Sequence, residues 1–201
     1  MGTVKVMPHP DPTRWEDGDL KRLSQENRRL AVELVVRKYR SKLYYHALCI
    51  VRDPQEAYDA VQEVFIKALR EPRFFTPDFQ MKAWLFRVTS NLCFNIVRDK
   101  KRRGGLLNTR QEEAAPQLPP RSATEHVLAG EVRGEMMAAL EHLTPAHREI
   151  LLLRYYNDLS YNEIADVLQV KLGTVMSRLS RARTRLAGVL GPEHPLVAEG
   201  V

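Results

Sequence analysis

Helical periodicity constrains the fold of this chain more than any other feature. Apolar residues recur every three or four positions in successive segments, and no segment alternates apolar and polar residues as a β-strand does. Residues 104–124 contain a Gly-Gly pair and three prolines, a composition that favours a linker over a packed helix. The sequence therefore predicts an all-α protein of two helical domains joined by a flexible linker. The expected helical segments are 19–51, 54–70, 81–103, 125–142 and 145–156, followed by two short terminal helices.

The predicted division of the chain follows from these segments. One domain spans residues 19–103 and the other residues 125–190, with the linker at 104–124 between them. Residues 1–18 contain several prolines and lack periodicity, so we expect a disordered arm, and residues 191–201 are expected to form a frayed tail.

The two terminal helices have the pattern of a helix-turn-helix. Ser160 and Glu163 are spaced as a capping box that begins the first helix, and Thr174 is expected to cap the second. Between Lys171 and Leu186 there are five Lys or Arg residues and no Asp or Glu, so the second helix should attract phosphate. A solvated amphipathic helix is the alternative. The pattern favours a DNA-reading helix whose outward side chains include Ser177, Arg178, Arg181 and Arg185.

Composition narrows the function further. The chain has 31 Lys and Arg against 25 Asp and Glu, a formal charge of +6, which favours an anionic partner. Cys49 and Cys93 lie in apolar helical patterns without a CxxC spacing, so we expect core thiols in a reducing cytoplasm. The histidines show no paired metal spacing, and no apolar run approaches the roughly 20 residues of a membrane span. We therefore expect a soluble intracellular protein with no metal, no cofactor and no membrane insertion.

One helix face of the first domain is acidic. Asp53 and Pro54 begin a helix on which Asp59, Gln62 and Glu63 share one face at spacings of three and four. Such a face is poorly suited to DNA and well suited to a basic protein groove, although an ordinary solvated surface is the alternative.

The segment 81–103 carries an unusual polar face. Asparagine is a poor choice in a helix interior, yet Asn91 and Asn95 stand in line with three arginines, which suggests recognition of bases and backbone. A Pro-bounded loop just upstream holds three phenylalanines, and we expect Phe74 or Phe79 to anchor the loop. Phe75 could stack on an unpaired base or pack in the core. The polar face consists of Arg87, Asn91, Asn95, Arg98 and Arg102.

Three segments of the chain resemble a known family. Residues 59–65 (DAVQEVF), 83–91 (AWLFRVTSN) and 172–183 (LGTVMSRLSRAR) are similar to motifs of the extracytoplasmic-function sigma factors, the two-domain group of the sigma-70 family. Three motifs in this order and with this gap are more specific than a helix-turn-helix alone. The resemblance covers about residues 19–190. It implies that the first domain binds core RNA polymerase and opens the promoter −10 element, and that the second reads the −35 element.

The resemblance also implies roles for single residues. Asp59, Gln62 and Glu63 would meet the clamp coiled coil of the polymerase β′ subunit. Phe75, Asn91 and Asn95 would capture a −10 base flipped from the melted strand, a step in which stacking offsets the cost of unpairing. Arg87, Arg98 and Arg102 complete the −10 set. The −35 set is Lys171, Thr174, Met176, Ser177, Arg178, Ser180, Arg181 and Arg183.

Within the −35 set, the expected contacts differ. Ser177, Arg178 and Arg181 would enter the major groove, while Lys171 and Arg183 would hold phosphates. Met176 departs from the family, because members often carry Lys or Arg there. The linker fits the arrangement: twenty residues reach roughly 65 Å when extended, against about 55 Å for one and a half turns of DNA.

Two alternatives belong to other classes of protein. A response-regulator-type activator has a similar helix-turn-helix, but its receiver domain would alternate strands and helices, which residues 19–103 do not. A helical nucleic-acid enzyme would need paired carboxylates or a metal cluster beside the basic face. The chain is therefore expected to have no catalysis of its own, and the resemblance adds an anti-sigma factor as a partner.

Overall fold

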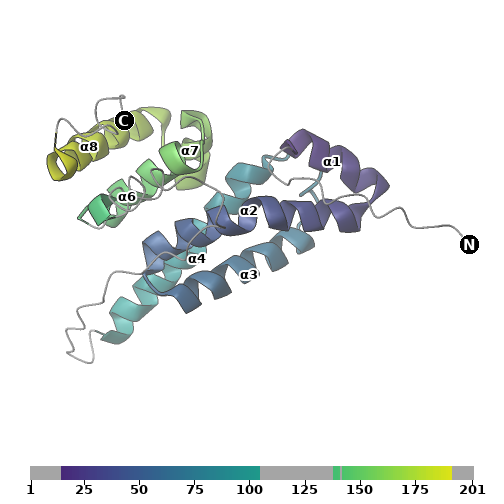
Figure 1. Cartoon of the computed structure of the whole chain (residues 1–201), viewed down its shortest axis with the longest axis horizontal. Coiled ribbons are helices and arrows are strands. Elements are labelled where there is room, and N and C mark those ends of the chain that lie inside the picture. Colours follow the sequence, from purple (N-terminus) through teal and green to yellow (C-terminus); the bar gives the residue numbers. More distant parts are fainter. Residues whose placement is uncertain (1–14, 105–137, 141, 192–201) are drawn as a thin grey trace, which may run out of the picture.

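A computed structural model describes residues 15–104, 138–140 and 142–191. The described residues are helical and include no strand, which confirms the predicted all-α fold (Figure 1). The expected linker 104–124, nearly all of the helix expected at 125–142, most of the arm and the tail lie outside them. The helices are α1 (Asp17–Glu26), α2 (Arg28–Val51), α3 (Pro54–Arg70), α4 (Met81–Gly104), α6 (Pro145–Leu151), the π-helical turn η2 (Leu152–Tyr156), α7 (Tyr161–Leu168) and α8 (Leu172–Leu190).

Helices α1 to α4 form the N-terminal unit. The segment 19–51, expected as one helical stretch, is two helices that meet at Asn27, whose side chain accepts a hydrogen bond from the Leu30 N–H at 3.0 Å. Helix α1 begins at Asp17, and the Asp17 carboxylate holds it on α2 by accepting from Lys38 Nζ at 2.6 Å and the Tyr39 hydroxyl at 2.5 Å. Helices α2, α3 and α4 then pack against one another around a common core.

The start of α3 follows the sequence prediction. Asp53 has an extended backbone and its side chain accepts from the Glu56 N–H at 2.9 Å, with Pro54 as the first helical residue. Because this cap fixes the helix register, the apolar residues Ala57, Val61 and Val64 turn to the core.

Helices α6, α7 and α8 form the C-terminal unit (residues 142–191). The predicted capping box at the start of α7 is present: the Glu163 N–H donates to Ser160 Oγ at 3.2 Å, and the Ser160 N–H donates to Glu163 Oε2 at 2.8 Å. Thr174 was expected to cap α8, and this expectation is wrong, because α8 begins at Leu172. The chain already turns at Gln169, which has a φ of 53°, so the helix can start earlier than the threonine.

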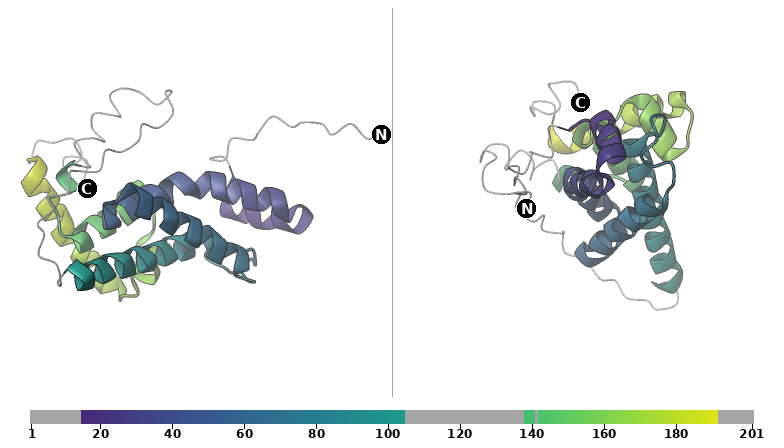
Figure 2. Two further views of the ribbon diagram at one scale, coloured as in Figure 1. Left: turned by 90° about the horizontal axis from the view of Figure 1, so that it is seen from below. Right: turned by 90° about the vertical axis from the view of Figure 1, so that its right-hand side faces the viewer.

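The two units pack against each other, with α7 on α4 and α6 on α2. Figure 2 shows the C-terminal helices alongside the N-terminal unit at the end away from α1. Lys82 Nζ donates to the Asp158 carbonyl at 2.8 Å, and the rings of Tyr45 and Tyr156 meet edge to face at 5.9 Å between centroids. The buried guanidinium of Arg148 also crosses the boundary.

Arg148 serves both units at once. Its Nη1 donates to the Cys49 carbonyl of α2 at 2.7 Å, while Nε and Nη2 donate to the Leu140 and Leu143 carbonyls at 2.8 and 3.2 Å. Three backbone acceptors satisfy a charge that would be costly to bury alone.

Helix α4 is buried on two sides because α2, α3 and α7 all pack against it. Helical spacing in the sequence predicts one apolar stripe, of which two residues are buried and four half-buried. The buried residues are Met81 and Leu85, and the half-buried ones are Trp84, Val88, Leu92 and Ile96. The second buried side was not expected. It comprises Phe86, Thr89, Ser90 and Cys93.

Candidate nucleic-acid and protein interfaces

Helix α8 presents a cationic surface to solvent. Its inner stripe is Val175, Leu179, Ala182 and Leu186, as predicted, and all four are buried. The helix carries four arginines and no acidic residue. This combination anchors one side of α8 in the unit and leaves the other free for an anionic ligand. Of the predicted −35 residues, Lys171, Met176, Ser177, Ser180 and Arg181 are exposed, and Thr174, Arg178 and Arg183 are half-buried.

Arg178 lies on the flank of α8 that faces α6. Glu149 of α6 is 4% exposed, and burial raises the pKa of its carboxyl to about 7, while a hydrogen bond with Ser90 and the charge of Arg178 act in the opposite direction. The charge of Arg178 therefore acts on a buried carboxyl as well as at the outer surface. Arg181 is exposed and available to a ligand.

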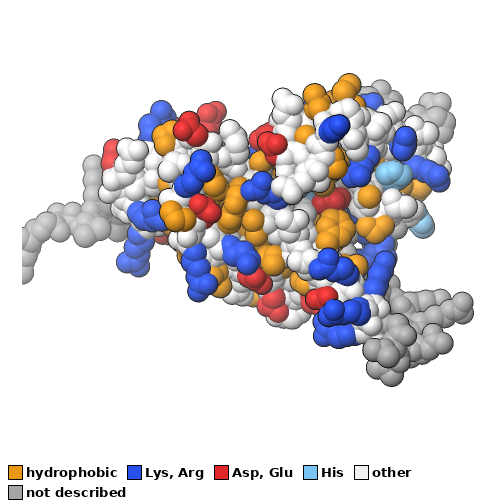
Figure 3. Space-filling view, turned by 180° about the vertical axis from the view of Figure 1, so that it is seen from behind, with side chains coloured by type: hydrophobic (Ala, Val, Ile, Leu, Met, Phe, Trp, Pro, Cys, Tyr) orange, Lys and Arg blue, Asp and Glu red, His pale blue; other side chains and the backbone are white. Residues whose placement is uncertain are grey.

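The predicted −10 face of α4 is open along most of its length. Asn91, Asn95, Arg98 and Arg102 are exposed and Arg87 is half-buried. Arg98 Nη2 donates to Asn95 Oδ1 at 2.9 Å, so the amide of Asn95 is oriented by its neighbour. Lys and Arg side chains gather at the lower right of the space-filling view (Figure 3). The last turn of α4 carries three exposed basic residues: Lys101, Arg102 and Arg103.

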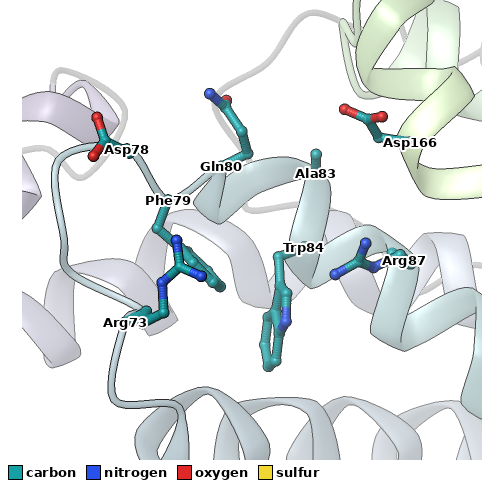
Figure 4. A pocket seen from close by; sticks show the side chains of 8 residues that line it. All are labelled: Arg73, Asp78, Phe79, Gln80, Ala83, Trp84, Arg87 and Asp166. Atoms are coloured by element: carbon teal, nitrogen blue, oxygen red, sulfur yellow. The ribbon is translucent and has the colours of Figure 1, made fainter.

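A cavity of about 320 Å³ opens at the start of α4. Phe79 and Trp84 line it with ring centroids 5.8 Å apart, and Arg73 and Arg87 lie on either side of this aromatic pair (Figure 4). Asp166 of α7 extends toward the cavity from the C-terminal unit. Aromatic rings between two guanidinium groups make a site for a flat, anionic ligand such as a nucleotide.

Phe75 lies apart from this cavity. Its ring meets Phe74 edge to face at 5.1 Å between centroids, and the Arg28 guanidinium lies over it at 5.4 Å. It packs on the core side of the loop, in line with the second interpretation of the sequence. Trp84, expected in the core, packs against it while half-buried, and it also lines the cavity. The cavity role was not predicted, and the signal for it is the position of Trp84 three residues before Arg87, at the start of the polar face.

The acidic residues of α3 lie where the sequence placed them, on an open face. Asp59, Gln62 and Glu63 are exposed, with Gln55 Nε2 donating to Asp59 Oδ1 at 3.1 Å and Glu63 Oε1 paired with Lys67 Nζ at 3.1 Å. These are surface contacts of small energy, so the face remains available to a partner.

A mostly apolar groove of about 780 Å³ adjoins the acidic face between α2 and α3. Gln62 belongs to both surfaces. Three large apolar side chains of α3 line the groove and are about half exposed, an unusual state for a helix with a well-filled core: Tyr58 (49%), Ile66 (47%) and Leu69 (51%). Sequence reasoning did not single them out, although their spacing with Gln62 at four, four and three marks one stripe.

Comparison with known proteins identifies the class. The family model "Sigma-70 region 2" matches residues 35–103, and "Sigma-70, region 4" matches residues 133–186. The chain therefore belongs to the sigma-70 family of RNA polymerase sigma factors, which are transcription initiation factors rather than catalysts. Its relatives place it in the extracytoplasmic-function (ECF) group.

Several relatives are known in that group. The chain is 32% identical over 186 residues to the RNA polymerase sigma-H factor of Pseudomonas aeruginosa, covering 90% of this chain and 96% of the relative. It is 32% identical to the ECF sigma-E factor of Escherichia coli over 67% of this chain and 73% of the relative. The ECF sigma factor SigW of Bacillus subtilis is 28% identical over 76% of this chain and 84% of its own. These relatives favour the sigma-factor interpretation over a response-regulator-type activator.

Solved structures agree. The sigma factor RpoE of Bartonella quintana, determined in complex with the anti-sigma factor NepR, superposes with a TM-score of 0.65 at 26% identity, covering 87% of this chain and 99% of that one. CnrH, determined in complex with the cytosolic domain of CnrY, shares the fold with a TM-score of 0.61 at 22% identity. In the part of the chain that the structure describes, none of the helices is long and apolar enough to span a membrane.

Proposed function

We propose that this sigma factor divides promoter recognition between α8, which reads the duplex −35 element, and the first half of α4 with its adjoining cavity, which takes bases of the melted −10 element. The observation that carries the proposal is the pair of arginine-rich surfaces on two separate units, one a regular helix and the other an aromatic cavity. The domain bounds proposed for this division are 19–103 and 125–190.

At the −35 element, the exposed part of α8 enters the major groove. Ser177 and Arg181 contact base edges, with Arg178 beside them, and Thr174, Met176 and Ser180 lie on the same part of the helix. Lys171 precedes the helix and Arg183 follows on its flank, where both meet phosphates. The free N–H groups of the first turn add a favourable potential for those phosphates.

At the −10 element, the cavity of Arg73, Phe79, Trp84 and Arg87 holds a base displaced from the stack. Unstacking costs a few kcal/mol, and stacking on an aromatic side chain returns about 1–3 kcal/mol per base. Asn91 and Asn95 follow along the open face of α4 with Arg98 and Arg102, and they bind the melted strand as it leaves the cavity. Since Phe75 packs on the core side of the loop, the proposal assigns stacking to Phe79 and Trp84.

The chain cannot read the −10 and −35 elements at the same time while its two units are packed together. Helix α7 lies against α4 and Asp166 lines the −10 cavity, yet the two DNA elements lie about 55 Å apart. The two units therefore have to separate when the promoter is bound.

Core polymerase binds the N-terminal unit through α3 and the groove beside it. Asp59, Gln62 and Glu63 meet a basic face of the β′ clamp, and the apolar groove beside them supplies the desolvated centre of the interface. An anti-sigma factor, as in the complex of RpoE with NepR, is the proposed negative regulator. The chain acts in the cytoplasm with its polymerase, requires no cofactor and performs no catalysis itself.

Permanganate footprinting of one promoter, with core polymerase and the purified chain, tests the division. Reactive thymines should appear at the −10 element only when the chain is present. Asn91→Ala should reduce their reactivity and alter the −10 base preference while binding through α8 persists. Normal melting with unaltered preference in that variant would assign the asparagines to structure instead.

A further inference from the structure

Two large apolar side chains stand in solvent at the start of the DNA-reading helix. Leu172 is 44% exposed and Met176 is 54% exposed, and their spacing of four places them on the same side of α8. The core of the unit does not use them, since it is filled from the neighbouring stripe of Val175 and Leu179, which are buried.

The residues around Met176 allow its side chain to reach the base edges at the floor of the DNA major groove. Besides Leu172, its exposed neighbours on the outward surface are Gly173, Ser177 and Ser180, all of them small, so the helix can approach base edges closely. Met176 is the longest uncharged side chain on this surface and extends beyond them. Cationic side chains lie to either side: Lys171, which meets a phosphate, ahead of the helix, and Arg181, which reaches base edges, a turn further on.

Only one kind of group in the major groove suits an apolar side chain at this position. The major-groove edges of the bases present hydrogen-bond donors, acceptors and one apolar group, the C5-methyl of thymine. Met176 against a bare donor or acceptor would strip water from a polar group and offer no hydrogen bond in return, which is unfavourable. Against a C5-methyl, both partners lose apolar surface to water, which is favourable.

We infer that Met176, supported by Leu172, reads a pyrimidine C5-methyl group in the −35 element, so that thymine is selected at one position. This inference rests on the proposed role of α8 and adds a specificity-determining residue to it. Cytosine methylated at C5 carries the same group, and the two sources are separated in the test.

The test measures the affinity of the holoenzyme, made from core polymerase and the full chain, for duplexes of one promoter at fixed salt. Each thymine of the −35 element is replaced singly by uracil, which removes only the methyl group, and each cytosine by 5-methylcytosine. One thymine-to-uracil change should weaken binding about three- to tenfold, the range expected for burying one methyl group. A gain at a 5-methylcytosine, without any thymine effect, would assign the reading to methylated cytosine.

Substitutions at Met176 test whether its side chain causes the effect of the methyl group. Met176→Ala should bring the thymine-to-uracil ratio to about one, and Met176→Leu should preserve most of it. Val189→Ala is the matched control, because Val189 is an exposed apolar residue of the same helix, 42% exposed, far from the first turns. Its ratio should equal that of the native chain.

Two outcomes would overturn the inference. Only the second would also overturn the proposed role of α8. If no methyl group matters, or if Met176→Ala leaves the ratio unchanged, while a scrambled −35 element still binds poorly and Arg181→Ala still weakens binding, the methyl reading fails and the role of α8 stands. If a scrambled −35 element binds as well as the native one, both fail.

Discussion

The buried polar residues at the boundary between the two units are few and closely grouped. His46 is fully buried, and its Nε2 lies 2.9 Å from Ser90 Oγ, while the carboxyl of Glu149 comes from the other unit to the same serine. Burial lowers the pKa of His46 to about 3, so its ring is neutral in ordinary buffers. Neither His46 Nδ1 nor Glu149 Oε1 finds a hydrogen-bond partner among the described residues. The boundary is therefore held together by apolar packing and by the side-chain donors Lys82 and Arg148 more than by this group.

Glu149 gives the protein a pH dependence whose sign is fixed by its shift. Its pKa is raised from 4.5 to about 7, so between these values the unfolded chain is ionised and the folded chain stays protonated. This residue therefore lowers stability progressively as pH rises from about 4.5 to about 7, by on the order of 3 kcal/mol. His46 acts in the reverse direction below pH 6.5, because the unfolded chain takes up a proton that the folded chain refuses.

The variant Glu149→Gln separates the pH dependence due to Glu149 from that due to His46. The variant should match the native chain near pH 4 and exceed it by about 2–3 kcal/mol at pH 8, because the glutamine has no charge to bury. Denaturant unfolding of both chains at several pH values measures this difference. An equal difference at pH 4 and pH 8 would contradict the assignment of the titration to Glu149.

Among the elements, α3 and α4 could be predicted nearly to the residue, and others could not. Asp53 followed by Pro54 fixes the start of α3 through local chemistry alone. The break at Asn27 was missed because an asparagine on a helix surface looks the same whether or not it caps a new helix. The π-helical turn at Leu152–Tyr156 has no local signal. The second buried side of α4 meets His46 of α2 and Glu149 of α6, which are tertiary contacts that no window of sequence contains.

The features of the candidate sites likewise differ in whether the sequence alone predicts them. The acidic face of α3 and the arginines of α8 follow from helical spacing, so sequence was enough. The cavity beside Trp84 joins a loop, the start of α4 and a residue of α7, and which of three phenylalanines turns into it depends on the path of the loop.

The acidic face of α3 has a direct test. Asp59→Lys with Glu63→Lys should abolish co-elution with core polymerase, because both side chains are exposed and the changes place like charges against a basic groove. Circular dichroism should be unchanged. Glu26→Lys with Glu33→Lys changes the net charge equally at exposed positions of α1 and α2, and this control should still co-elute. Undiminished co-elution of the first variant would remove the clamp assignment.

Helix α8 should contain two kinds of contact. Arg181→Ala should cost about 1–3 kcal/mol and relax preference at a few −35 positions, as loss of a base contact does. Lys171→Ala and Arg183→Ala should weaken binding to every sequence alike and lower the salt slope by about one each. Titration of −35 variants at several salt concentrations distinguishes them, and a uniform loss for Arg181→Ala would move that residue to the phosphates.

For the whole molecule, the packed arrangement and the promoter-bound arrangement have to differ. Dyes at Arg22→Cys in α1 and Asn162→Cys in α7 report the separation by energy transfer, and the native Cys49 and Cys93 are buried and so protected from labelling. Transfer should fall when core polymerase and promoter are added. A pair at Asn162→Cys and Val189→Cys, both within the C-terminal unit, should not change. Constant transfer in the first pair would contradict the separation of the units.

Start-site mapping shows whether this chain gives core polymerase its promoter specificity. A genomic fragment library is transcribed by purified core polymerase with and without the chain. New start sites should appear only with the chain and share one −35 and one −10 sequence at a constant spacing. Start sites that are unchanged by the chain, or that appear only when another sigma factor is supplied, would contradict this role of the chain.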